Sequence, residues 1–405
     1  MKILLSAYAC MPGQGTELGN GWNWAIHLAE KGHDVVVLTS ANWKDAIEDT
    51  VKSQKITNPR FVYIALPSAV EPLIKAGRGM KLQIHYLLWQ WYVYYSAEQI
   101  DLVEKFDVVH HVTLGSLQGG TWLWRLNKPL VFGPVGGGQT APPAFKKYFM
   151  EYWWRESIRS FITNYLLRFI PTAVLTMKKS GVVLVTNKET DVLAKKLGAK
   201  RVVFILDNSV SESYLLSQPP PLKQSDTLNL LWVGSLLPRK ALNLALEALS
   251  CVDRKIPFIL TIVGGGALQD RINRQIEKLG LVDKVVVMGS IPWDEVRTMY
   301  LQSDIFIFTS LRDSCPAQLM EAMAVGLPII TLNHHGSRDI VPDGAGVKVN
   351  VDTPVECVAK IAHAIESLYH DPLMRLEMGS AGYNFARTAT WSNKIDTISE
   401  IYSSL

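Results

Sequence analysis

Short runs of apolar, largely β-branched residues alternate with amphipathic stretches along all 405 residues of the chain. Within each run the apolar residues follow one another directly, as is typical of strands buried on both faces of a parallel sheet. The stretches between them have the pattern of helices that cover such sheets. The sequence therefore predicts strands at residues 2–7, 34–39, 60–66, 106–112, 129–133, 181–186, 201–206, 228–234, 258–264, 284–289, 304–309, 327–331 and 346–350.

A polar, proline-rich segment interrupts this alternation once. Pro219, Pro220 and Pro221 are consecutive, and such a segment can continue neither a helix nor a central strand. The chain is also too long for one ordinary core. We predict an α/β protein of two facing Rossmann-like domains with a deep cleft between them. The expected ranges are an N-terminal domain over 1–209, a linker over 210–227, a C-terminal domain over 228–388, and a helix over 389–405 that packs back on the N-terminal domain.

Composition excludes several classes of protein. Hydrophobic residues make up 48% of the chain and charged residues 19%, as in ordinary globular proteins, and the net charge of +4 is too small to indicate nucleic-acid binding. The four cysteines form no C-x-x-C pair and no cluster with histidine, which indicates a reducing compartment and no structural zinc. The uncharged stretch 82–97 is too short and too polar to span a bilayer. We expect a cytoplasmic protein.

Candidate chemistry lies where predicted strands end, because ligands of open α/β sheets bind at the carboxyl ends of the strands. After the strand at 228–234, Arg239 and Lys240 precede a helix, and two cations at a helix start suit a diphosphate. A solvated basic pair at the start of a surface helix is the alternative. After the next strand, Gly264–Gly266 would allow the backbone to approach a ligand closely, although a tight turn has the same requirement.

A third strand end carries two acids. Asp313 lies in the loop after the strand at 304–309, and Glu321 lies about one turn into the helix that starts near Ala317. The helix N-terminus offers amides to an anion. A carboxylate at Glu321 could accept two ribose hydroxyl groups, because it has several lone pairs.

These segments resemble the nucleotide-sugar half of retaining GT-B glycosyltransferases of family four. The matching segments are "VGSLLPRK", "IVGGG", "VVVMGSIPWDEV", "DIFIFTSLRDSCPAQLMEAMAVGLPII" and "HHGSRDIVPDGAGVKV". The family has two glutamates separated by seven residues, and this chain has Asp313 at the first position and Glu321 at the second. The first half resembles the family more loosely, in "SAYACMPGQGTELGNGW", "FDVVHHVTLGS" and "VFGPVGGGQTAPPAF", with a likeness to bacterial polysaccharide-assembly transferases.

The resemblance implies a set of site residues and no metal. Catalytic roles fall on His110, His111, Arg239, Lys240 and Asp313. Donor contacts fall on Gly15, Thr16, Gly234, Ser235, Arg239, Lys240, Gly264, Ser314, Cys315, Pro316, Ala317 and Glu321. The acceptor side would include Glu17, Gly136, Gly137 and Gly138. A histidine near the donor is common in the family, and either His110 or His111 could take that position, because successive strand residues face opposite sides. The spacing from Asp107 favours His110, whereas the position at the strand end favours His111.

The segment 145–179 combines aromatic and basic residues at helical spacing. It contains seven basic and only two acidic residues. Three interpretations stay open: an interfacial helix on anionic lipid, a helical pair on the sheet with a solvated basic face, and a groove for a glycan acceptor. The first would add peripheral contact with the inner face of the cell membrane.

We therefore expect a retaining, metal-independent hexosyltransferase without a cofactor. Its donor would be a nucleotide sugar such as UDP-glucose, and its acceptor a glycan or a lipid-linked glycan in polysaccharide biosynthesis. A nucleotide-sugar epimerase of the same architecture is one alternative, and a non-catalytic sugar-nucleotide sensor is another. A nicotinamide-dependent dehydrogenase is disfavoured because Gly13, Gly15 and Gly19 miss the G-x-G-x-x-G spacing and the second strand ends without an acid.

Overall fold

The computed structural model describes residues 1–14, 17–67, 80–221 and 226–405. It contains every strand that the apolar runs predict, with ends that differ by a few residues. The strands are β1 (Lys2–Ala7), β2 (Asp34–Ser40), β3 (Arg60–Ile64), β4 (Val108–Thr113), β5 (Leu130–Val135), β6 (Val182–Val185), β7 (Val202–Phe204), β8 (Leu228–Val233), β9 (Phe258–Val263), β10 (Val285–Gly289), β11 (Ile305–Phe308), β12 (Ile329–Leu332) and β13 (Gly346–Val349).

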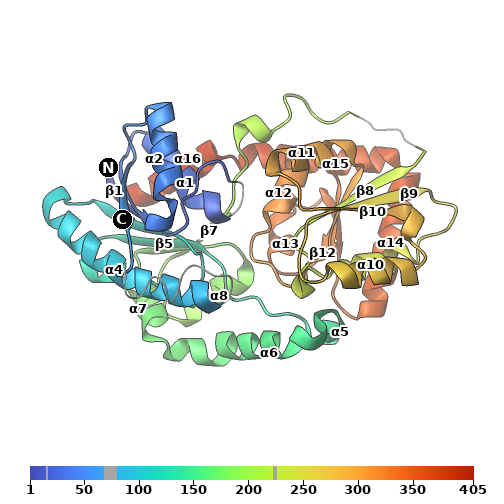
Figure 1. The fold of residues 1–405 in the computed structure, drawn as a ribbon, viewed down its shortest axis with the longest axis horizontal. Helices are drawn as coiled ribbons and strands as arrows, with labels where there is room; N and C mark the ends of the chain where they lie inside the picture. The colour runs from blue at the N-terminus through green and yellow to red at the C-terminus, as the bar shows by residue number, and fades with distance from the viewer. Residues whose placement is uncertain (15–16, 68–79, 222–225) are drawn as a thin grey trace. The chain divides into compact units, whose positions relative to one another are not determined.

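Helices connect most of these strands, as the alternating pattern predicts (Figure 1). None of the helices in the described ranges has both the length and the hydrophobicity that a membrane-spanning helix needs. The α-helices are α1 (Glu17–Glu30), α2 (Lys44–Gln54), α4 (Met80–Glu104), α5 (Lys146–Phe149), α6 (Trp153–Phe161), α7 (Pro171–Lys179), α8 (Lys188–Lys196), α9 (Leu242–Leu249), α10 (Gln269–Lys278), α11 (Trp293–Gln302), α12 (Ala317–Ala324), α13 (His335–Ile340), α14 (Pro354–His370), α15 (Pro372–Thr388) and α16 (Trp391–Ser403).

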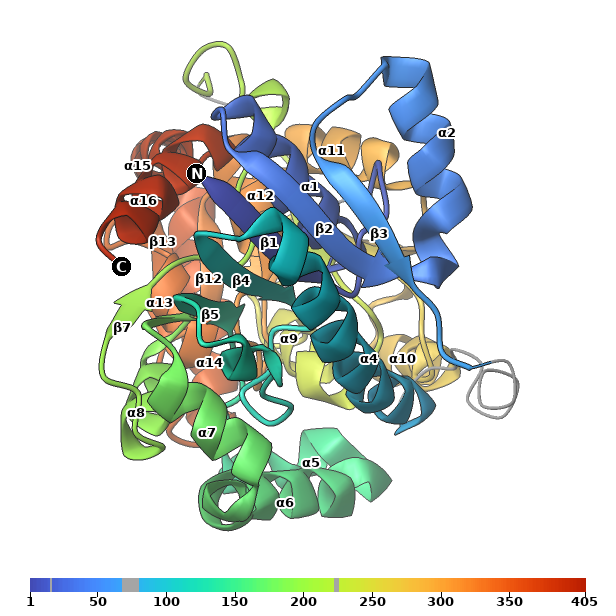
Figure 2. The same ribbon diagram turned by 90° about the vertical axis from the view of Figure 1, so that its left-hand side faces the viewer.

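The chain folds into two compact α/β units. The first comprises residues 1–138, 162–208 and 391–405, and its parallel sheet has the strand order β3-β2-β1-β4-β5-β6-β7. Adjacent residues of β1 pack into hydrophobic cores on opposite faces of the sheet. Leu4 packs with Trp89 of α4, and Leu5 packs with residues of α1 and α16. Figure 2 shows α4 lying along this sheet. Both faces of the sheet are therefore covered, which explains why its strands are continuously apolar.

The second unit comprises residues 139–161 and 209–390, and its sheet has the order β10-β9-β8-β11-β12-β13. All strand pairs in it are parallel. In both sheets the strand order reverses beside the first strand, between β1 and β4 and between β8 and β11. Ligands of doubly wound sheets bind at this reversal, where the loops after two adjacent strands diverge. Loops after β8 and β11 are therefore the structural candidates for a site.

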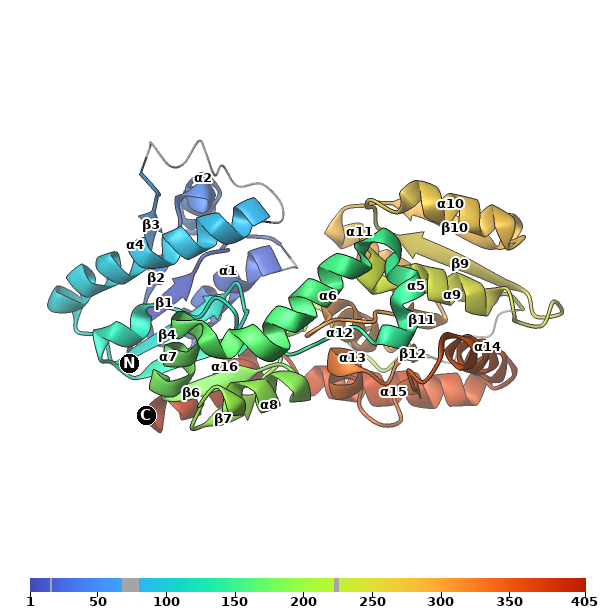
Figure 3. The same cartoon turned by 90° about the horizontal axis from the view of Figure 1, so that it is seen from below.

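One segment lies outside the unit to which its place in the sequence would assign it. Residues 139–161 fall within the range 1–209 that we predicted as one domain, yet they pack in the core of the second unit. Phe145, Tyr148 and Phe149 are buried there among residues of β8, β9 and α9. Figure 3 shows α5 and α6 of this segment. Burial of three aromatic side chains accounts for the position of the segment, since each contributes about 2 kcal/mol or more of transfer free energy.

Candidate functional site

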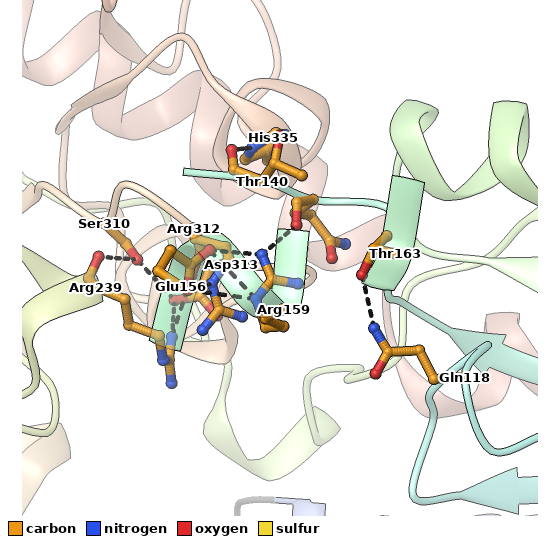
Figure 4. A network of polar contacts seen from close by, with 11 residues as sticks. Gln118, Thr140, Glu156, Arg159, Thr163, Arg239, Ser310, Arg312, Asp313 and His335 are labelled. Carbon is orange, nitrogen blue, oxygen red and sulfur yellow. Dashed lines mark hydrogen bonds and ion pairs between the residues drawn. The ribbon is translucent and has the colours of Figure 1, made fainter. Parts of the chain in front are cut away.

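The strongest polar cluster of the second unit lies at the reversal of its strand order. The loop after β8 contains the short helix η8 (Pro238–Lys240), and the loop after β11 contains Asp313. One oxygen of the Asp313 carboxylate, Oδ2, accepts hydrogen bonds from Lys240 Nζ at 2.5 Å, Arg239 Nη1 at 3.1 Å and Ser310 Oγ at 3.1 Å. Figure 4 shows Arg239, Ser310 and Asp313 converging. The two cations and the acid that we assigned to one ligand therefore contact each other.

Burial and charge act in opposite directions on this cluster. Burial alone would raise the pKa of Asp313, but Lys240 and Arg239 lower it, so the pKa stays below its ordinary value. Burial lowers the pKa of Lys240, and Asp313 partly offsets this shift. Asp313 is therefore ionised at neutral pH, and its negative charge favours the charged form of Lys240. The side chain of Arg239 remains 30% exposed and that of Lys240 only 6%, so Arg239 is the more accessible cation for an anionic ligand.

Hydrogen bonds to backbone carbonyl groups hold the two loops together. The Leu311 amide donates to the Arg239 carbonyl at 2.8 Å, and Arg239 Nη1 donates to the Arg312 carbonyl at 3.3 Å. Thr309 Oγ1 donates to the carbonyls of Lys240 and Ala241. The positions of the cations are thus fixed before a ligand binds, which is the condition for electrostatic preorganisation.

Glu321, the second predicted acid, lies on α12 and has two aromatic donors. Trp293 Nε1 donates to its Oε1 at 3.1 Å, and the Tyr300 hydroxyl donates to its Oε2 at 3.0 Å. Burial raises the pKa of Glu321, and these two hydrogen bonds lower it in part. Each carboxylate oxygen has two lone pairs, so Glu321 can accept further hydroxyl groups while it keeps both donors.

The predicted glycines and the residues before α12 have tight backbone contacts. A side chain at Gly264, where φ is +130°, would lie 2.0 Å from the Gly234 carbonyl oxygen. The predicted Ser235 follows Gly234 in the same loop and is exposed. A side chain at Gly336 would lie 2.0 Å from the carbonyl oxygen of Ser314. Close backbone packing thus explains these glycines without a ligand. The predicted contacts of Ser235, Gly264 and of Ser314, Cys315, Pro316 and Ala317 stay predictions.

Three charged residues beside Asp313 were not predicted as part of a site. Glu156 of α6 pairs with Arg159 on the same helix and with Arg312 of the loop after β11 (Figure 4). In the sequence, Glu156 and Arg159 are recognisable only as members of the basic, aromatic segment 145–179. No pattern in the sequence linked Glu156 to Arg312, because the two residues are 156 positions apart.

Both candidate histidines of the first unit are fully buried in β4. The Nδ1 atom of His110 lies 2.6 Å from the Tyr402 hydroxyl, and its Nε2 atom lies 2.7 Å from the Gly133 carbonyl oxygen. His111 faces the opposite side, with Nε2 2.9 Å from the Tyr86 hydroxyl and Nδ1 3.2 Å from Ser6 Oγ. Burial lowers the pKa of each to about 3, so both are neutral at pH 7. These partners occupy both nitrogens of each ring, and a catalytic role for either histidine stays a prediction.

The remaining candidates of the first unit, two donor contacts and four acceptor-side residues, are only partly described. Gly15 and Thr16 lie outside the described residues. Glu17 begins α1, and its carboxylate accepts a hydrogen bond from the Gly115 amide. A side chain at Gly138 would lie 2.5 Å from the Glu189 carbonyl oxygen, whereas Gly136 pairs with Ser116 and Gly137 has a φ of +131°. Close packing therefore accounts for Gly138, and the acceptor roles stay predictions.

The two parallel α/β units, with strand order reversing beside a pair of preorganised cations, define the architecture as the GT-B fold. Residues 217–385 match the family model described as "Glycosyl transferases group 1". The match includes the loops that carry Arg239 and Asp313 and the helix α12 that carries Glu321.

Curated relatives match part of the chain. A phosphatidylinositol N-acetylglucosaminyltransferase component from Arabidopsis thaliana is 29% identical over 185 residues, which are 45% of this chain and 40% of the relative. The putative colanic acid biosynthesis glycosyltransferase WcaL of Escherichia coli K12 is 33% identical over 131 residues, which are 30% of this chain and 32% of the relative. The chain thus spans less than half the length of these curated relatives.

Solved structures match the whole chain in fold. Crystal structures of the Anabaena HepE protein with UDP and with UDP-glucose have TM-scores of 0.67 and 0.66 at 17% and 16% identity. Each comparison covers 100% of both chains. Identity at this level establishes the shared fold and no shared substrate.

Proposed function

We propose that the protein is a retaining glycosyltransferase that moves a hexose from a UDP-sugar to a glycan or lipid-linked acceptor in polysaccharide biosynthesis. The observation that carries this proposal is the pair Arg239 and Lys240, anchored on Asp313 at the reversal of the second sheet within the family-matching region. The activities of the relatives support transfer to a polysaccharide or a lipid, and the HepE complexes support a UDP-hexose donor.

The chemistry of transfer explains why the cations matter. When the bond between the sugar C1 and the phosphate oxygen breaks, negative charge develops on the departing diphosphate. Arg239 and Lys240 would stabilise that charge, and fixed donors are worth most when they need no reorganisation. Glu321 would bind the ribose hydroxyl groups, a contact shared by the ground and transition states. Asp313, which resembles the family's first acid but is one methylene shorter, would lie toward the donor sugar.

We propose attack from the face that the diphosphate leaves, so that the anomeric configuration is retained. The acceptor oxygen forms its bond to C1, the C1–O bond to the phosphate breaks, and the acceptor proton passes to the departing phosphate oxygen. This reaction needs no protein base in line with the acceptor. The buried position of His110 and His111, each with both ring nitrogens occupied, supports a mechanism without a histidine base.

Exposed aromatic side chains in the segment 145–179 support peripheral contact with anionic membrane. Trp154, Ile158 and Phe161 are each more than half exposed on α6, and the Arg155 guanidinium lies 5.2 Å from the Trp154 ring centre. Aromatic rings and adjacent cations suit the headgroup region of a bilayer. Co-sedimentation with anionic vesicles should decrease at high salt, and binding indifferent to lipid charge would contradict membrane contact.

A panel of nucleotide sugars tests the proposed reaction. The protein is incubated with UDP-glucose, UDP-galactose, UDP-N-acetylglucosamine and GDP-mannose, and released nucleoside diphosphate is measured with and without glycan acceptors. We expect slow hydrolysis of one UDP-hexose and faster release with the correct acceptor. The product anomer is then read by NMR, and an α-linked product from an α-linked donor is expected. A β-linked product would refute retention, and no release from any donor would refute the transferase assignment.

A further inference from the structure

Glu156 forms a buried bridge between two arginines of the second unit. Its Oε1 lies 2.6 Å from Arg159 Nη2, and its Oε2 lies 3.0 Å from Arg312 Nε. The carboxylate also accepts a hydrogen bond from the Ala141 amide. Burial would raise the pKa of Glu156, but Arg159 and Arg312 lower it below its ordinary value, so this carboxylate is charged at neutral pH.

The segment that carries Glu156 is anchored at several points within this unit. Arg159 Nη2 donates to the Gln139 carbonyl at 2.6 Å, and His335 Nε2 lies 2.8 Å from the Thr140 carbonyl oxygen. Further along, Lys147 Nζ and the Tyr148 hydroxyl both donate to Glu247, at 2.8 and 2.7 Å. Glu156 is therefore presented to Arg312 by a fixed piece of backbone rather than by an unconstrained surface helix.

The charges of the whole network do not balance. Arg159, Arg239, Lys240 and Arg312 are four cations, whereas Glu156 and Asp313 are the two acids they contact. The acids lie deeper, with 6% and 17% of their side chains exposed, than the three arginines, which are 24% to 30% exposed. Two excess positive charges therefore lie at the accessible side of the network, and an anion of about two charges would neutralise them.

Arg312 has the geometry to contact such an anion. It directly precedes Asp313 in the chain, and its carbonyl accepts the hydrogen bond from Arg239 Nη1, so it borders the cation pair. Glu156 forms an ion pair at its Nε atom, and within the described ranges its two terminal nitrogens have no ion-pair partner, so both can face a ligand. A guanidinium fork held in this way matches two phosphate oxygens at once.

We propose that Arg312 is a third phosphate-binding cation of the donor site and that Glu156 is its positioning residue. The proposal rests on the proposed function, because it assumes that the donor diphosphate binds at Arg239 and Lys240. It names a contact between Arg312 and the diphosphate of a nucleotide sugar, and it assigns a role to Glu156, which lies outside the segments that resemble the family. The alternative is that the Glu156–Arg312 pair only fixes the segment to the unit.

Calorimetry with UDP, uridine and inorganic pyrophosphate separates these alternatives. Arg312→Ala should lower the affinity for UDP and for pyrophosphate about tenfold or more, the value of one charge-assisted contact. The affinity for uridine should not change. Glu156→Gln removes a negative charge, so a purely long-range effect would strengthen UDP binding. Release of Arg312 should instead weaken it about threefold or more. Glu151→Gln is the matched control: it removes an acid of the same segment that pairs with exposed Arg271 at 2.8 Å, and UDP affinity should not fall.

Each outcome decides between the two proposals. If the wild type binds UDP and Arg312→Ala binds it equally, Arg312 is no phosphate ligand, whereas the proposed function survives. If Arg312→Ala lowers the affinity for uridine and for UDP equally, Arg312 has a structural role only. If Glu156→Gln strengthens UDP binding, positioning by Glu156 is refuted. If the wild type binds pyrophosphate but not UDP, the nucleotide assignment fails and Arg312→Ala still tests the phosphate contact. If it binds neither, both proposals are overturned.

Discussion

Glu321 offers the sharpest test of the nucleotide site, because the binding free energy lost in Glu321→Gln can be estimated from the contacts of the carboxylate. The carboxylate accepts from Trp293 at 3.1 Å and from Tyr300 at 3.0 Å, and we propose that it also accepts ribose hydroxyl groups. Glutamine has one oxygen acceptor and one amide donor in the same volume. It therefore loses the charge and turns an N–H group toward one of two donors.

Hydrogen bonds to a charged group contribute about 1.5–3 kcal/mol each, compared with about 1 kcal/mol between neutral groups. If two ribose hydroxyls bind the carboxylate and one weaker bond survives in Glu321→Gln, the loss is about 2–5 kcal/mol. That corresponds to a dissociation constant for UDP about 30-fold higher or more. Because the contact is shared by ground and transition states, the donor KM should rise more than kcat falls.

The assay compares UDP with 2′-deoxy-UDP by calorimetry in both proteins. The wild type should prefer UDP by about tenfold, the value of one hydroxyl bond to a charged acceptor, and Glu321→Gln should lose most of this preference. Glu277→Gln, at an exposed position of α10, is the matched control and should bind as the wild type does. Equal UDP affinity in Glu321→Gln and wild type, or an undiminished preference for the 2′-hydroxyl, would refute the ribose contact.

The pKa of Glu321 adds a pH dependence of known sign. Because burial raises this pKa, the carboxyl group takes up a proton at a higher pH than an ordinary glutamate does. The protonated group is a weaker acceptor, so affinity should fall as pH falls through the raised pKa. Uridine is the suitable probe, since it has no phosphate that titrates in this range. A uridine affinity with the same pH profile in Glu321→Gln would contradict the assignment.

Further predictions concern the cations and the buried charges. Arg239→Ala and Lys240→Ala should each lower turnover about 10²-fold or more, and steady-state assays showing full activity in both would exclude charge stabilisation by this pair. Asp313→Asn leaves the buried Lys240 without its counter-charge and should lower the free energy of urea unfolding by about 3 kcal/mol; a loss below about 1 kcal/mol would contradict the buried pair. His110 and His111 have folded pKa values near 3 and an ordinary value near 6.5. The stability that the two neutral histidines contribute to the fold is therefore complete above pH 6.5. It is lost as the pH falls toward 3, by up to about 3 kcal/mol per pH unit for the pair. The slope of unfolding free energy against pH should decrease in His110→Gln.

The strands could be predicted from the sequence because a strand that is buried on both faces is apolar at consecutive positions. Val35–Leu38 in β2 and Ile305–Phe308 in β11 are buried on both faces of their sheets, so every residue of these runs is apolar. The same local signal places Arg239 and Asp313 at strand ends. A strand end is also where a doubly wound sheet binds ligands, so candidate residues of the second unit followed from position alone.

The partners of these residues depended on contacts between distant parts of the chain. Asp313 pairs with Arg239 across 74 positions, and Glu156 reaches Arg312 because aromatic residues of its own segment pack into the second core. The adjacent histidines illustrate the same limit: alternation along β4 sends them to opposite faces, but only packing with Tyr402 and Tyr86 buries both. The periodicity of apolar residues along a chain indicates whether a side chain is buried. Which residue it contacts depends on how distant helices and strands pack against each other, and the local sequence pattern does not contain that information.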